Sequence, residues 1–178
     1  MEHSTAEDLV SVQMQGLILH GTLANVYCLA GCPRAARFHV CQELEESKHH
    51  MMTNEKIIGK LGEIVHARTT ESLDYDSTVG NYWTYFKPLK DLTVMPKDEE
   101  EQTNIHRHAL LAWHAHEEMA VQVYKQVVSE DPECYFWRML LSGAEKELAM
   151  IKTLMAKKFD KELQIDGKVQ MLMQAMKK

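Results

Sequence analysis

Apolar side chains recur at steps of three and four residues along most of the chain, a pattern that predicts amphipathic helices. The first helix should cover residues 5–29, because Ser4 and Glu7 have the spacing of a capping box just before the periodic stretch. One face of this helix carries, at these steps, Leu9, Gln13, Leu17, His20, Ala24 and Tyr27. Two polar side chains, Gln13 and His20, therefore interrupt an apolar stripe.

Glycine, proline and acidic residues mark the next two helices. Gly31 breaks the chain, and Pro33 suits the first turn of a second helix that extends to about Gly62. The acidic run that starts at Asp98 would oppose the dipole of a third helix, which should continue to about Val128.

The rest of the chain predicts a fourth helix and a long connection. The fourth helix should start at Asp131 and Pro132 and end near Lys158, and a short last helix is predicted over residues 161–176. Residues 66–97 carry aromatics, prolines and turn formers without a sustained period, which favours a crossover with a short helix near residues 81–86. A connection of this length lets the two middle helices run parallel.

We therefore expect a single all-α domain over residues 1–178, since this length allows one substantial core and not two. The predicted fold is an up-down-down-up four-helix bundle. Its parts are a helix hairpin over 5–62, a crossover over 66–97, a second hairpin over 98–158 and a C-terminal segment over 159–178.

Charge and composition narrow the function. Lys and Arg number 20 against 26 Asp and Glu, for a net charge of −6, so no concentrated positive face is available for nucleic acid. No apolar run reaches the roughly 20 residues that a membrane span needs. The N-terminus is polar and acidic where a signal peptide would be basic and then apolar, and the four cysteines form no CxxC pair. We expect a cytoplasmic protein that binds neither nucleic acid nor membrane.

The two hairpins resemble each other in sequence. Equal spacings occur at matching places: thirteen residues from Pro33 to Glu46 and from Pro132 to Glu145, and seven residues from His20 to Tyr27 and from Glu117 to Tyr124. An internal repeat of this kind predicts that matching positions face each other. It makes His20 the counterpart of Glu117, and Glu46 the counterpart of Glu145.

These residues resemble the motifs of ferritin-like and rubrerythrin-like proteins. Glu117, Ala120 and Tyr124 match an ExxAxxxY pattern, Glu46 and His49 match ExxH, and Glu145 stands where the second ExxH should begin. The resemblance implies a di-iron centre, in which a carboxylate from each of two helices joins an ExxH from each of the other two. It implies redox chemistry with dioxygen or peroxide, and tyrosines 27 and 124 as donors to the carboxylates.

The match to that family departs from the pattern in two places. Leu148 stands where the second histidine would be, and the first helix offers His20, or Gln13 further back, in place of a glutamate. The candidate metal ligands are then His20, Glu46, His49, Glu117 and Glu145. We expect one or two iron ions, with manganese as the other suitable metal, and weaker or single occupancy compared with a complete di-iron site.

Two structural alternatives stay open for these residues. Glu117 lies at the centre of an apolar face, so its charge needs either a cation or a partner such as His20 or His114. Glu45 competes with Glu46 as the glutamate that acts together with His49, because the apolar side of this helix does not centre on Glu46.

The leading functional hypothesis is an iron-binding, ferritin-like oxidoreductase that forms a homo-oligomer, with a dimer favoured. Electrons would come from a separate donor, since no rubredoxin-like pair of CxxC motifs follows the bundle. Two alternatives belong to other classes: a non-enzymatic helical module whose site has decayed, and an iron-storage subunit.

Overall fold

A computed structural model describes residues 1–68 and 77–159, and helices are the only regular elements in these two ranges. The long helices are α1 (His3–Leu29), α2 (Pro33–Leu61), α4 (Glu99–Glu130) and α5 (Tyr135–Phe159), and α3 (Tyr82–Lys90) is short. The all-α class is confirmed. The helix predicted over residues 161–176 lies outside the described residues.

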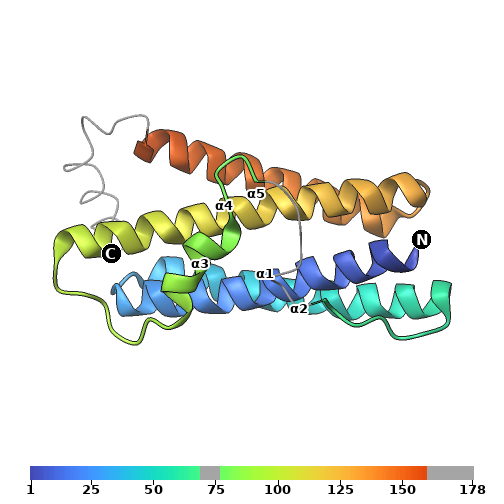
Figure 1. Cartoon of the computed structure of the whole chain (residues 1–178), viewed down its shortest axis with the longest axis horizontal. Coiled ribbons are helices and arrows are strands. Elements are labelled where there is room, and N and C mark those ends of the chain that lie inside the picture. The colour runs from blue at the N-terminus through green and yellow to red at the C-terminus, as the bar shows by residue number, and fades with distance from the viewer. Residues whose placement is uncertain (69–76, 160–178) are drawn as a thin grey trace.

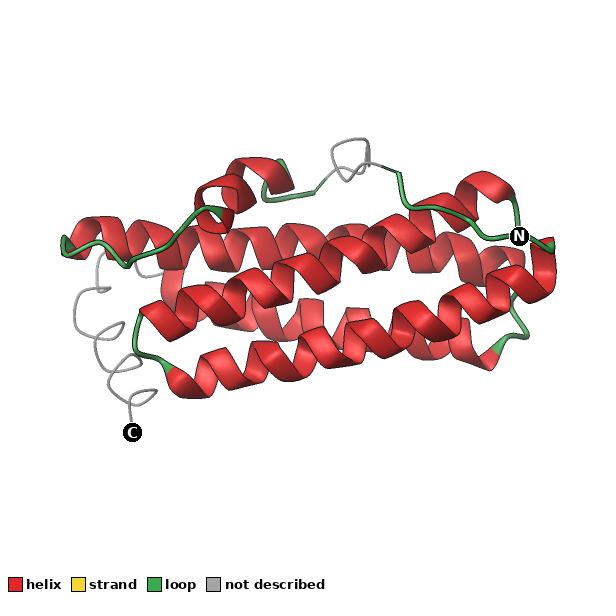
Figure 2. Ribbon diagram, turned by 90° about the horizontal axis from the view of Figure 1, so that it is seen from below, coloured by secondary structure: helices red, strands yellow, loops and turns green. Residues whose placement is uncertain are grey.

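The four long helices form two antiparallel pairs, α1 with α2 and α4 with α5, which meet mainly where α1 packs on α4 (Figures 1 and 2). The short α3 packs on α4 and also touches α1. Figure 1 places the end of α2 and the beginning of α4 at opposite ends of the molecule, so these two helices run in the same direction. The end of α2 and the start of α4, which this connection joins, therefore lie at opposite ends of the bundle.

Local signals explain where several helices begin and end. At the N-termini of α4 and α3, Asp98 Oδ1 accepts a hydrogen bond from the Glu101 N–H at 2.9 Å, and Asn81 Oδ1 accepts one from the Trp83 N–H at 2.8 Å. Gly62 follows α2 with a φ of 75°, a left-handed conformation that glycine adopts without strain. The predicted second and third helices are thus confirmed within one or two residues at most ends.

Two predicted helix starts are wrong. Helix α1 begins at His3, so Ser4 lies inside it and forms no capping box. Helix α5 begins at Tyr135 and not at Asp131 and Pro132, which belong to the preceding turn. The Asp131 carboxylate there accepts a hydrogen bond from the Trp137 indole N–H at 3.2 Å and pairs with Lys60 Nζ at 2.6 Å, which joins this turn to α5 and α2.

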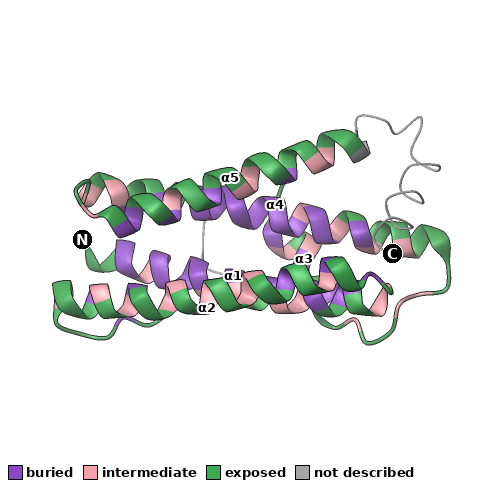
Figure 3. Ribbon diagram, turned by 180° about the vertical axis from the view of Figure 1, so that it is seen from behind, coloured by how far each residue is buried: buried purple, intermediate pink, exposed green. Residues whose placement is uncertain are grey.

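Burial is uneven among the helices (Figure 3). Helices α1 and α4 supply most of the core, whereas α2 buries only Ala35, His39, Thr53 and Ile57. The apolar positions that repeat along α2 are largely exposed: Val40, Leu44, Met51, Met52 and Ile58. The apolar stripe of α2 therefore does not face the core of the described chain.

The crossover is tied to α4 by a buried carboxylate. Glu118, 6% exposed, accepts hydrogen bonds from the Ser77 hydroxyl at 2.8 Å and from the Thr78 N–H and hydroxyl at 2.7 and 2.6 Å. Lys152 of α5 lies 3.4 Å from the same carboxylate. These bonds hold residues 77–78 against the second hairpin. In the described ranges, the helices lack an apolar stretch that could cross a membrane.

Candidate metal centre

Three side chains from three different helices converge inside the bundle. His20 of α1, Glu117 of α4 and Glu147 of α5 each place one ligand atom within 4.8 Å of the other two. His20 and Glu117 are 1% and 5% exposed. The structure thus brings His20 and Glu117 together, as the repeat predicts, and adds Glu147, which the sequence reasoning missed.

Helical spacing directs both glutamates inward. Glu117 lies on the buried face of α4 between Trp113 and Tyr124, and the face continues on either side of it. Along α5, Leu140, Ala144 and Ile151 are buried. Together with Glu147, which lies between Ala144 and Ile151, they form one stripe with steps of four, three and four residues. This stripe was the sequence signal that could have identified Glu147.

Glu145 does not join this cluster. The equal spacings from Pro33 to Glu46 and from Pro132 to Glu145 predicted that it would, and this prediction is wrong. The Glu145 side chain is 50% exposed, and its Oε1 lies 3.7 Å from Nζ of Lys125. Two residues along an α-helix correspond to a rotation of about 200°. Glu145 and Glu147 therefore point to nearly opposite sides of α5.

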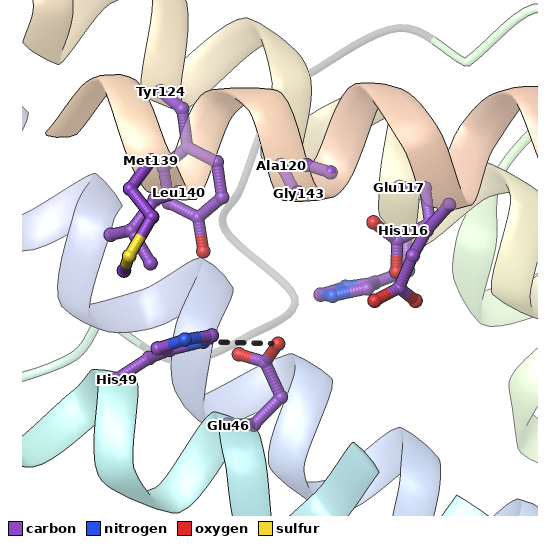
Figure 4. A pocket seen from close by; sticks show the side chains of 11 residues that line it. Glu46, His49, His116, Glu117, Ala120, Tyr124, Met139, Leu140 and Gly143 are labelled. Carbon is purple, nitrogen blue, oxygen red and sulfur yellow. Dashed lines mark ion pairs between the residues drawn. The ribbon is translucent and has the colours of Figure 1, made fainter. Parts of the chain in front are cut away.

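The cluster borders a cavity of about 150 Å³, to which α2 contributes Glu46 and His49 (Figure 4). The Glu46 carboxylate lies 3.7 Å from Nδ1 of His49, and Figure 4 shows the Tyr124 hydroxyl pointing toward these two side chains. The competing residue Glu45 is exposed. Of the two pairs considered, Glu46 with His49 is the one that faces the cavity.

His116 is a second cavity residue that is not among the ligands predicted from the sequence. It is 4% exposed, and its Nδ1 lies 3.1 Å from Oε1 of Gln15. An amide oxygen only accepts hydrogen bonds, so Nδ1 carries the proton and Nε2 keeps a lone pair. That nitrogen lies over Gly16, where a Cβ atom would be 2.8 Å from Nε2 and 3.6 Å from Cδ of Glu46. Glycine is therefore what lets His116 and Glu46 approach α1 together.

The carboxyl groups of Glu117 and Glu147 lie close together with too little positive charge nearby to balance them if both ionise. Burial raises the pKa of Glu117 well above 4.5, and the charges of Glu147 and Glu46 raise it further. Burial, with Glu46 and Glu45, raises the pKa of Glu147 to about 7. Among the described residues, the buried Oε2 of Glu147 has no hydrogen-bond partner. Protons or a cation must therefore share this space.

The histidines that face the cluster are neutral, because burial lowers the pKa of His20 to about 4 and that of His116 to about 3. His49 differs, since the nearby Glu46 carboxylate raises its pKa. Carboxylate oxygens and neutral imidazole nitrogens are together the donors that suit ferrous iron and manganese. The donor set, the unpartnered carboxylate oxygen and the cavity thus fit a divalent cation.

Three other candidates have different partners. Gln13 donates a hydrogen bond to Thr53 Oγ1 at 2.8 Å. His114 Nδ1 lies 3.7 Å from Glu118 and not beside Glu117. Tyr27 stacks on His39 and His106 with ring centroids 5.3 and 5.7 Å away. Of the two tyrosines proposed as donors, only Tyr124 lines the cavity.

No family model, no curated protein and no solved structure matches this chain.

Proposed function

We propose that this chain is a metal-binding helical bundle of the ferritin-like kind, which holds iron or manganese at His20, Glu117 and Glu147. The observation that carries the proposal is the convergence of these three ligand atoms within 4.8 Å in the interior of the bundle. A bound cation would offset the carboxylate charges that burial otherwise makes costly. The parallel course of α2 and α4 supports the ferritin-like, up-down-down-up arrangement.

The cavity beside the cluster supports a second, weaker set of ligands. Glu46 and His49 of α2, with Nε2 of His116, line the same space and would complete the coordination of one ion or hold a second. When bound, iron would supply one-electron redox chemistry toward dioxygen or peroxide. The protein's residues would bind the ion and exclude bulk water, and Glu117 and Glu147 would exchange the protons they hold in the metal-free protein for the cation. Electrons would come from a separate donor.

Metal analysis tests this proposal directly. The purified protein is stripped with a chelator, reconstituted anaerobically with Fe²⁺ or Mn²⁺, desalted and analysed for bound metal. Glu147→Gln should lose the ion, because it removes a charged ligand of the cluster. Glu145→Gln is the matched control on the same helix, two residues away, and should bind like the wild type.

Each outcome separates two readings of the bundle. Metal bound by the wild type and by Glu145→Gln, but not by Glu147→Gln, supports the cation site. A wild-type protein that binds no metal would favour the non-enzymatic module with a decayed site. The expected homo-oligomer stays a prediction, and native mass would distinguish a dimer from an iron-storage cage.

A further inference from the structure

His20 shares its second ring nitrogen with another buried histidine. Nδ1 of His20 lies 3.0 Å from Nδ1 of His39 on α2, within hydrogen-bond distance. The two side chains are 1% and 2% exposed, and in the described chain His39 makes no hydrogen bond to a carboxylate. At this distance one of the two facing nitrogens must carry a proton and donate it, and the other must accept it.

The rings around this pair prevent His39 from turning away. Tyr27 stacks on His39 with an angle of 5° between the ring planes, and the edges of Phe38 and Trp113 approach it at centroid distances of 5.2 and 4.9 Å. The His20 and His39 rings are themselves stacked 5.2 Å apart. The contact between the two Nδ1 atoms is therefore fixed by packing.

Two arrangements of the protons are open to such a pair. If His39 donates, the proton of His20 lies on Nε2, and that nitrogen has no lone pair for a cation. If His20 donates, its Nε2 is free, and His39 carries its own proton on Nε2. Since Nδ1 of His20 is taken by His39, only the second arrangement allows His20 to bind an ion.

We propose that His39 is a positioning residue for the candidate metal centre: it accepts the hydrogen bond from Nδ1–H of His20 and so fixes the tautomer that presents Nε2 to the cation. This inference rests on the proposed function. Metal-binding histidines commonly donate their other ring N–H to a protein acceptor, and loss of such an acceptor typically weakens metal binding about 10–100-fold.

Three variants test the role of the acceptor. His39→Phe keeps an aromatic ring and removes the acceptor, so it should weaken Mn²⁺ binding about 10–100-fold. His39→Asn puts an amide oxygen near the place of Nδ1 and should restore most of the affinity. His106→Phe alters another buried histidine that stacks on Tyr27 and is not one of the proposed ligands, and it should bind Mn²⁺ like the wild type.

The results distinguish this inference from the proposed function. If the wild type binds no Mn²⁺, the metal centre itself is wrong and the role of His39 falls with it. If the wild type binds and His39→Phe binds equally well, the metal centre stands and the positioning role is overturned. Equal losses in His39→Phe and His39→Asn would also overturn it, because packing alone would then explain the effect.

A measurement on the unaltered protein covers the case in which the variants do not fold. Zn²⁺ is diamagnetic and accepts the same donors, so nitrogen-15 NMR of the Zn²⁺-loaded protein reports the tautomer of each histidine. We expect His20 to be protonated at Nδ1 and His39 at Nε2. A Zn²⁺-loaded protein with His39 protonated at Nδ1 would overturn the inference.

Discussion

Neutralising Glu147 should make the metal-free protein more stable at neutral and alkaline pH. Burial is the main cause that raises the pKa of Glu147 from 4.5 to about 7. In the unfolded chain this carboxyl ionises near its ordinary value. Between these two pH values the folded protein therefore holds a proton that the unfolded chain has lost. Folding stability consequently falls as the pH rises through this window.

The pKa values set the size of the effect. Each pKa unit corresponds to about 1.4 kcal/mol, so ionisation of Glu147 should cost the folded protein about 3 kcal/mol once the pH is above 7. Glu147→Gln avoids this cost because the amide stays neutral. For a chain of this length, about 3 kcal/mol corresponds to roughly 6–12 °C in the thermal midpoint.

Urea unfolding in the presence of a chelator, at pH 5 and at pH 8, measures this difference. The gap in unfolding free energy between Glu147→Gln and the wild type should grow by about 2.5 kcal/mol from pH 5 to pH 8, because the unfolded carboxyl is already partly ionised at pH 5. The buried histidines contribute to the pH dependence of the unfolding free energy in both proteins, so their contributions largely cancel in the comparison. Glu145→Gln should follow the wild type, because Glu145 is half-exposed and lies outside the cluster.

A gap that stays constant with pH would refute this reasoning, because Glu147 would then ionise as it does in the unfolded chain. Added Mn²⁺ should reverse the order of stability. A ligand at about 1,000 times its Kd stabilises the folded state by about 4.1 kcal/mol, which exceeds the cost of about 3 kcal/mol for the buried charge, and only the wild type keeps all three proposed ligands.

Three further substitutions test other parts of the structure. Gly16→Ala should destabilise the protein by about 1–3 kcal/mol in urea unfolding, because its Cβ would lie 2.8 Å from Nε2 of His116; an unchanged midpoint would mean that the ring moves aside freely. Glu118→Gln should cost about 1.5–3 kcal/mol and speed hydrogen exchange at the Thr78 amide, which donates to Glu118; unchanged exchange there would contradict the anchoring of the crossover. Trp137→Ala should cost about 3–5 kcal/mol in thermal unfolding, since Trp137 is 1% exposed; a loss below 1 kcal/mol would argue against its place in the core.

The helices could be predicted because their signals are local. Pro33, Gly62 and Asp98 lie at helix ends where backbone geometry and capping favour them. Glu117 could be identified for the same reason, since the apolar positions around it follow the helical period. These features depend on neighbours within a few residues along the chain.

The remaining candidate ligands depend on how the helices pack. Pro33 is the first residue of α2, whereas Pro132 lies in a turn before α5, so counting from the two prolines compared unequal starting points. The unequal starting points selected Glu145, which faces away from the cluster. His39 had no such signal, because its role depends on the contact with His20 across two helices.

The shallow burial of α2 has a consequence for how the interior exchanges with solvent. With only four buried side chains among its 29 residues, α2 should have a lower free energy of local unfolding than α1 or α4. A partial opening of α2 would carry Glu46 and His49 away together, while Glu117 and Glu147 kept their places on the other hairpin. An ion could then enter or leave through a subglobal fluctuation, at a rate set by one helix and not by unfolding of the whole protein.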